Sequence, residues 1–177
     1  MFKRFLLTIL FFFTASIVFG QIGSARTRIV LNFKEQQSLL VSHPSVDLNL
    51  DKVDVYSNGA ETGNLKSHLI VNCSTPYELS VKTINSYFQY ELSLSSLPVS
   101  IINLKPSISK STSIDSPLKL NTISLANTAQ VILQSENRGN SQQIDVNYII
   151  PKQNVSSLLN KKPGKYQTEI IYTLLAH

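Results

Sequence analysis

The side chains of this sequence that are able to do covalent or metal chemistry are few and scattered. Cys73 is the only cysteine, and the three histidines, His43, His68 and His177, stand far apart in the chain. No two of them have metal-ligand spacing, and the H-E-x-x-H, C-x-x-C, G-x-S-x-G and phosphate-loop patterns are all absent from the sequence. A convergent catalytic triad stays open, because its members meet only in the fold. From the missing motifs we nevertheless expect a protein that holds no metal or cofactor and is not an enzyme.

One acidic run has the spacing with which calcium loops begin. The segment "DLNLDKVD" (47–54) matches D-x-N-x-D, but Lys52 occupies the glycine position and Asn58 the position of the closing glutamate. The leucines between the acids indicate instead the solvated face of a strand.

Cys73 and a cluster of lysines each have an ordinary structural explanation. In "HLIVNC" (68–73) the cysteine shares a face with Leu69 and Val71, so we expect a small buried side chain rather than a reactive thiol. The turn "NKKPGK" (160–165) is typical of solvated surface, and binding of an acidic glycan or lipid headgroup is the alternative.

The first twenty residues, "MFKRFLLTILFFFTASIVFG", have the pattern of a secretory signal peptide. Lys3 and Arg4 precede the apolar run Phe5–Phe13, which is about half the length that a membrane-spanning helix needs. We expect residues 1–20 to be cleaved, which leaves 157 of the 177 residues, 21–177, as a single domain. We therefore expect the protein in the periplasm, outside the cell or on its surface.

Removal of the signal lowers the formal net charge from +5 to +3, because Lys3 and Arg4 are lost. A charge of this size, spread along the chain, does not indicate a nucleic-acid partner. A secreted chain with one cysteine has no internal disulfide, so its core must hold the fold together.

The elements that must position these side chains are strands. Apolar and polar residues alternate in 46–51, 77–82, 88–94 and 144–150, which is typical of half-buried antiparallel strands. Less regular strands are expected at 27–33, 37–42, 53–56, 67–73, 99–104, 118–125 and 129–134. Only 155–160 has a helical pattern, and 105–117 is expected to be a long surface connection. About eight to ten short strands without a long helix predict an immunoglobulin-like antiparallel β-sandwich, with a closed barrel as the alternative.

The closing run "KYQTEIIYTLLAH" (165–177) starts polar on one face and becomes apolar on both. A strand that is apolar on both faces is expected inside a sheet, between two neighbours.

Near the other end, "TRIVLNF" (27–33) places Ile29, Leu31 and Phe33 on one face. Such a segment is able to form the first strand of its own domain, which we favour, or to add a donor strand to another subunit.

Three segments resemble small secreted bacterial surface proteins with pilin-like, spore-coat-U-like or related fimbrial sandwich domains. They are 46–63, 68–83 and 147–177, whose closing part reads "PGKYQTEIIYT". Spore-coat-U-like proteins generally carry cysteine pairs, from which the single Cys73 departs. The resemblance implies a structural or adhesive role, such as that of a pilus-type subunit or accessory, with other copies or surface-assembly proteins as partners. A self-contained glycan- or peptide-binding module is the alternative, and an unrecognised hydrolase is the third.

Overall fold

Strands form most of the regular structure of this chain, as the alternation predicts. The computed structural model describes residues 27–32, 34–110 and 118–177. Of its thirteen strands, nine have four or more residues. In chain order the elements are β1 (Gln37–Val41), α2 (Val55–Asn58), β2 (Gly59–Glu61), β3 (Leu65–Cys73), β4 (Tyr77–Thr83), β5 (Tyr87–Tyr90), β6 (Ser93–Pro98), the 3₁₀ turn η1 (Val99–Ile101), β7 (Asn103–Lys110), β8 (Lys119–Leu120), β9 (Ile123–Ser124), β10 (Gln130–Ser135), β11 (Gly139–Pro151), the 3₁₀ turn η2 (Lys152–Leu158), β12 (Tyr166–Gln167) and β13 (Ile170–Ala176).

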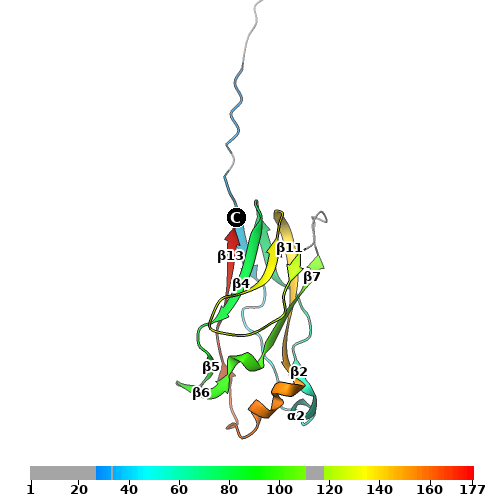
Figure 1. Cartoon of the computed structure of the whole chain (residues 1–177), viewed down its shortest axis with the longest axis vertical. Helices are drawn as coiled ribbons and strands as arrows, with labels where there is room; N and C mark the ends of the chain where they lie inside the picture. Colours follow the sequence, from blue (N-terminus) through cyan, green and yellow to red (C-terminus); the bar gives the residue numbers. More distant parts are fainter. Residues whose placement is uncertain (1–26, 33, 111–117) are drawn as a thin grey trace, which may run out of the picture. The chain divides into compact units, whose positions relative to one another are not determined.

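These strands form three antiparallel sheets within the body Lys34–His177 (Figure 1). The first sheet has the order β1-β3-β11-β7-β9, with β2 paired to β11. The second sheet has the order β13-β4-β10-β8, and a small third sheet has the order β12-β5-β6. Every described ladder is antiparallel, so the chain is all-β, as expected.

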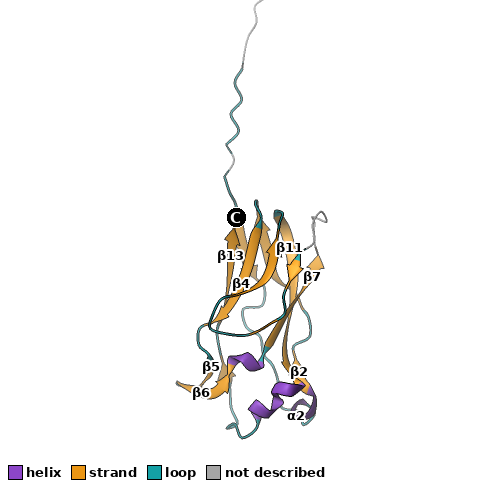
Figure 2. Cartoon of the chain, in the orientation of Figure 1, coloured by secondary structure: helices purple, strands orange, loops and turns teal. Residues whose placement is uncertain are grey.

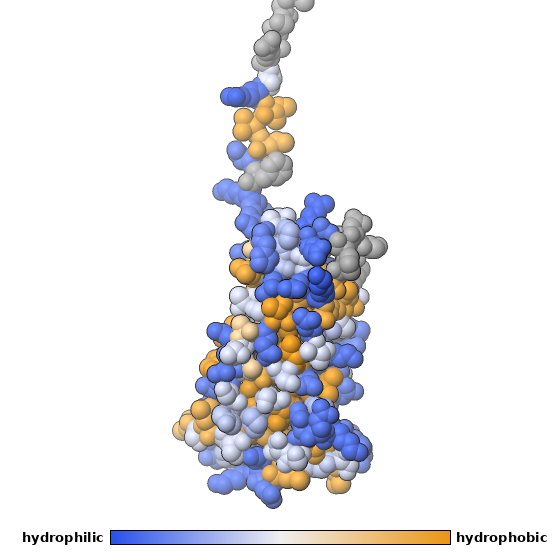
Figure 3. Space-filling model, viewed as in Figure 1, coloured by the Kyte–Doolittle hydropathy of each residue, from blue (hydrophilic) through white to orange (hydrophobic). Residues whose placement is uncertain are grey.

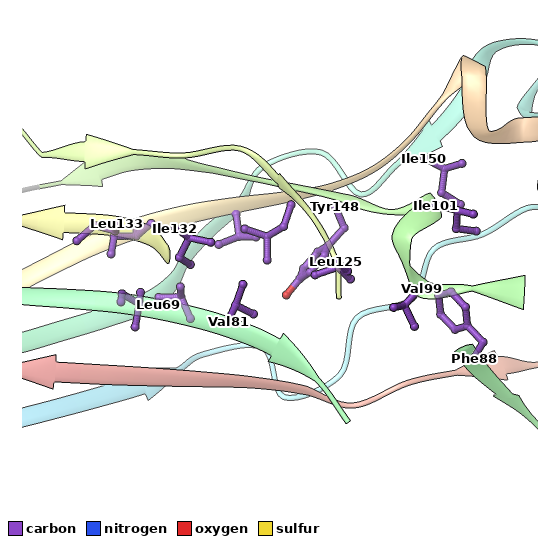
Figure 4. Close-up of a cluster of buried hydrophobic side chains, with 14 of the residues drawn as sticks. Leu69, Val81, Phe88, Val99, Ile101, Leu125, Ile132, Leu133, Tyr148 and Ile150 are labelled. Carbon is purple, nitrogen blue, oxygen red and sulfur yellow. The ribbon is translucent and has the colours of Figure 1, made fainter. Parts of the chain in front are cut away.

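The core lies between the first two sheets. Leu69 of β3, Val81 of β4 and Ile132 of β10 all point into it (Figure 4) and are at most 1 % exposed. A face-to-face arrangement of two sheets over one apolar core is a β-sandwich, which confirms the predicted fold class.

The long strand β11 is more deeply buried than its alternation predicts. Ile144, Val146 and Tyr148 face the core as expected, but Asp145 and Asn147 on the opposite face are also buried. Neighbouring segments cover this second face of β11. Asn147 bonds to Glu61 and Thr62, and Asp145 bonds to Lys66 and Ser67.

Two expected strands between residues 46 and 56 are not formed. Residues 46–51 have the alternating burial of a strand, yet they have no ladder partner. Residues 53–56 overlap the short helix α2, which ends at the turn "SNG". Gly59 has φ +89° there, and a side chain on it would collide with the carbonyl oxygen of Ile150.

Three other predictions are wrong in their boundaries. The run 88–94 is broken at Glu91 and Leu92 by the turn of the β5–β6 hairpin, so that Leu92 is 98 % exposed. Residues 103–110, assigned in large part to a surface connection, form β7 beside β11. The range 118–125 divides into β8 and β9, which belong to different sheets.

The helical turns η2 and α2 lie at the end of the body opposite the C-terminus (Figure 2). The helical segment expected at 155–160 overlaps η2, which begins earlier and ends at Leu158. No helix among the described residues is long and apolar enough to cross a membrane.

Cys73 is 3 % exposed, and its sulfur lies 3.8 Å from the Thr75 hydroxyl oxygen. We expect a thiol reagent to label the native protein far more slowly than the denatured protein, because the reagent has no access to a buried sulfur. Absorbance on reaction with an aromatic disulfide, with and without denaturant, measures both rates. Equal rates would contradict the burial.

Candidate functional site

The closing strand β13 is an open edge of the second sheet, not an interior strand. It pairs with β4 over its whole length, from Ile170 opposite Thr83 to Ala176 opposite Tyr77. Among the described strands, none pairs with its other side. The expectation that an all-apolar strand lies between two neighbours is therefore wrong for this chain.

The side chains of β13 explain why its sequence suggested an interior position. Ile170, Tyr172 and Leu174 pack against the core but stay half-buried. On the outer face Ile171 is 40 % exposed and Leu175 is 55 % exposed. An edge that presents free backbone groups beside apolar side chains is a template for strand addition.

The strand β1 is the edge of the first sheet and contacts β13 without forming a ladder with it. Its core-facing residues Leu39 and Val41 are half-buried, like those of β13. In the strands between the edges, Leu69, Val71 and Leu79 are fully buried. The core is therefore only partly covered along the side where β1 and β13 meet.

The segment 27–32 forms no regular structure. Ile29 is 81 % exposed and Leu31 is 72 % exposed, and apolar side chains of this segment are visible in Figure 3. Phe33, the third residue of the expected face, lies outside the described residues. The strand expected at 27–33 is absent over the residues described, and the first strand of the body is β1.

A chain of four polar side chains runs beneath the β13 edge. The Nδ1 atoms of His43 and His68 are 3.3 Å apart, and the Nε2 of His68 is 3.1 Å from the Tyr148 hydroxyl. That hydroxyl is 2.6 Å from the hydroxyl of Tyr172, which belongs to β13. The chain joins the two sheets, because His68 and Tyr148 come from the first and Tyr172 from the second.

Burial controls the ionisation of this chain. His68 is 1 % exposed, and burial followed by the charge of His43 lowers its pKa to about 4. Burial also raises the pKa of Tyr148, and burial and the neighbouring Tyr148 raise the pKa of Tyr172. All three side chains are therefore neutral at pH 7.

Sequence reasoning did not bring these residues together. His43 and His68 meet because β1 pairs with β3 in a register that places Val41 opposite Leu69 and lets Ser42 N–H donate to the carbonyl of His68. Alternation placed His68 on the face opposite Leu69, yet both are buried. Ser67 has φ +49°, and this left-handed residue disturbs the alternation just before His68.

The same left-handed residue bonds to Asp145, a buried carboxylate that also pairs with the exposed Lys66. The Asp145 carboxylate accepts hydrogen bonds from the Lys66 ammonium at 2.7 Å and from Ser67 N–H at 2.8 Å. Burial alone raises the pKa of Asp145, but the bonds from Lys66, Ser67 and Ser109 outweigh it and hold this pKa below its usual value. The carboxylate lies at the irregular stretch where β3 and β11 lose their regular register, and it bonds to the backbone there.

The other candidate sites remain separate surface features. Asp47 and Asp51 are exposed, and the described residues contain no group of three or more histidine, cysteine or acidic side chains that could hold a metal. Lys161 donates to Ser96, while Tyr166 packs on Tyr90 at a ring distance of 4.9 Å. A surface cavity of about 280 Å³ is lined by Pro76, Tyr77, Glu78, Lys119, Gln134, Ser135, Glu136 and His177.

Comparison with known proteins gives no relative from which a role could be transferred. No protein-family model, no curated protein and no solved structure matches this chain.

Proposed function

We propose that this protein is a secreted surface protein with a structural or adhesive role, a fimbria-like subunit or accessory that assembles by strand addition at β13. The signal-like residues 1–20 support secretion, and the pilin-like pattern of the closing strand supports the class. The observation that carries the proposal is the open β13 edge, whose exposed outer face is apolar.

The donor in this proposal is the segment 27–33 of a second copy. It has seven residues, as β13 does, and its alternate residues Ile29, Leu31 and Phe33 are apolar. Main-chain hydrogen bonds to β13 would supply affinity, and these side chains would cover the half-buried residues of β1 and β13.

Glu35 and Gln36, which follow the segment 27–33, are bonded to the body of the protein, and this favours a donor from another copy. Gln36 exchanges hydrogen bonds with Ser74, since its N–H donates to the serine hydroxyl and its carbonyl accepts from the serine N–H. The Glu35 carboxylate accepts from the Thr75 hydroxyl at 3.4 Å. Pairing of 27–33 with the β13 of its own chain would require a reversal in the one residue between Phe33 and Glu35, whereas a second copy has no such constraint.

The test is the mass of the secreted protein in solution as its concentration rises, measured by sedimentation equilibrium. We expect concentration-dependent oligomers for the wild type and a monomer for the double variant Ile29→Asp/Leu31→Asp. A charged side chain is costly to bury in the apolar contact proposed between this segment and the residues of β1 and β13. The matched control is Val30→Asp, which carries a charge on the other face of the same segment and should still assemble.

A cross-linking experiment then identifies the acceptor strand. Val30→Cys in one copy and Thr173→Cys in another, both on the outward face of the proposed pair of strands, should form a disulfide-linked pair when mixed, while Val30→Cys mixed with Ser124→Cys on β9 should not. A wild type that is monomeric at every concentration, or assembly that survives the Ile29→Asp/Leu31→Asp change, would refute strand addition by this segment.

A further inference from the structure

The polar chain beneath β13 permits only one direction of hydrogen bonding when it is neutral and complete. Two facing Nδ1 atoms form a hydrogen bond only if one of them carries a proton and the other does not. If His68 Nδ1–H donates to His43, the Nε2 of His68 is free to accept from the Tyr148 hydroxyl, which accepts in turn from Tyr172. Every member then has a partner.

One added proton reverses this direction. When the Nδ1 of His43 is protonated, it donates to the Nδ1 of His68, whose Nε2–H must then donate to Tyr148. Tyr148 donates to Tyr172, and the hydroxyl hydrogen of Tyr172 needs a new acceptor. A second proton would place two cations on nitrogens 3.3 Å apart, so the pair excludes it.

We propose that this chain is an acid-sensitive latch on β13, in which protonation of the histidine pair releases the hydroxyl of Tyr172 and loosens the open edge. The inference rests on the proposed function in one respect, because it makes strand addition at β13 weaker in acid. The bonds that transmit the effect run without a gap from His43, which is half-buried, to the edge strand itself.

The surroundings support the sign of the effect. The titratable groups in contact with His68 are His43, Tyr148 and Tyr172, while Lys66 of the same strand and Asp145 of β11 pair with each other. The pKa of His68 is about 4 when latched and about 6.5 when free, so the released state binds more protons between these values. Latching is therefore complete above pH 6.5 and is lost as the pH falls toward 4.

Hydrogen exchange of the β13 amides in the full chain measures the latch. The Ile29→Asp/Leu31→Asp background keeps the measurement independent of assembly. The shifted pKa implies that protection of these amides, corrected for intrinsic exchange, falls roughly 30-fold between pH 7.5 and pH 5. In His68→Gln, which is able to bond to Tyr148 but does not titrate, the fall should disappear. The control His177→Gln removes an exposed histidine outside the chain and should behave as the parent does.

A second measurement does not depend on a buried variant. Nitrogen chemical shifts of the imidazoles should show His68 neutral down to pH 5, with its proton on Nδ1 in the latched state and on Nε2 once the direction of the chain has reversed. Unchanged β13 protection, an equal fall in His68→Gln, or a fixed tautomer would overturn the latch. If these readouts fail while the wild type assembles, strand addition stands without the latch. If β13 loosens in acid as expected but the wild type does not assemble, the latch stands and only assembly is refuted.

Discussion

Replacement of Asp145 by alanine is expected to lower the free energy of unfolding by about 3 kcal/mol, because each hydrogen bond to a charged acceptor contributes roughly 1.5–3 kcal/mol and this carboxylate accepts more than one. The carboxylate is 1 % exposed and accepts from both Lys66 and the Ser67 backbone. Its removal leaves the N–H of Ser67, a half-buried residue held at φ +49°, without this acceptor. Urea unfolding followed by circular dichroism measures the change.

The two partners of this pair should differ in their effect. Lys66 is 74 % exposed, so its ammonium regains water when the pair is broken, and Lys66→Ala should cost at most about 1 kcal/mol. Asp145→Asn keeps an acceptor for Ser67 and should fall between the two alanine variants. A Lys66→Ala variant as unstable as Asp145→Ala would show that the ion pair, rather than the backbone bond, fixes this stretch.

Asp145, like His68, should lose its stabilising contribution in acid. The pKa of His68 is lowered by burial, whereas the pKa of Asp145 is lowered by its hydrogen bonds. Its folded pKa is lowered below the ordinary value of 3.8, so its contribution is complete above that value and is lost as the pH falls through the folded pKa. The wild type should therefore lose stability below pH 3.8 more steeply than Asp145→Asn.

The sequence predicted the fold class because that prediction depends on local periodicity. Alternation in 77–82 and 144–150 correctly identified the core face of β4 and β11, since one buried face leaves a period of two. The same period failed in 46–51, where Val46, Leu48 and Leu50 face the core without a ladder partner. Alternation predicts which residues are buried. It does not predict whether another strand lies alongside to form hydrogen bonds, because that depends on residues far away in the sequence.

The candidate site depended almost entirely on such non-local facts. The meeting of His43 with His68 is set by the register of β1 on β3, which neither segment encodes alone. The position of β13 was misjudged for a related reason. An apolar face covered within the chain and an apolar face left for a partner have the same sequence pattern, so Ile171 and Leu175 suggested an interior strand.

Deletion of β13 is expected to abolish cooperative folding, even though this strand is an edge. A chain that ends at Gln167 keeps β12 but loses Ile170, Tyr172 and Leu174 from the core. Half-buried side chains of this size contribute about 1.5 kcal/mol each, and their loss also uncovers Leu79 and Val81 of β4, now fully buried. The total approaches the roughly 5–15 kcal/mol by which a whole domain is stable.

The two faces of β13 provide the matched comparison for this deletion. Leu174→Ala, on the core side, should lower the free energy of unfolding by about 2 kcal/mol, since the half-buried side chain loses packing contacts. Leu175→Ala, on the exposed side, should change it by at most about 0.5 kcal/mol in the monomer.

Thermal unfolding by calorimetry tests the deletion of β13 itself. A truncated chain that still melted in one sharp transition near the wild-type temperature would show that β4 is able to close the sandwich alone, and the edge on which assembly is proposed to depend would then lie on β4 instead.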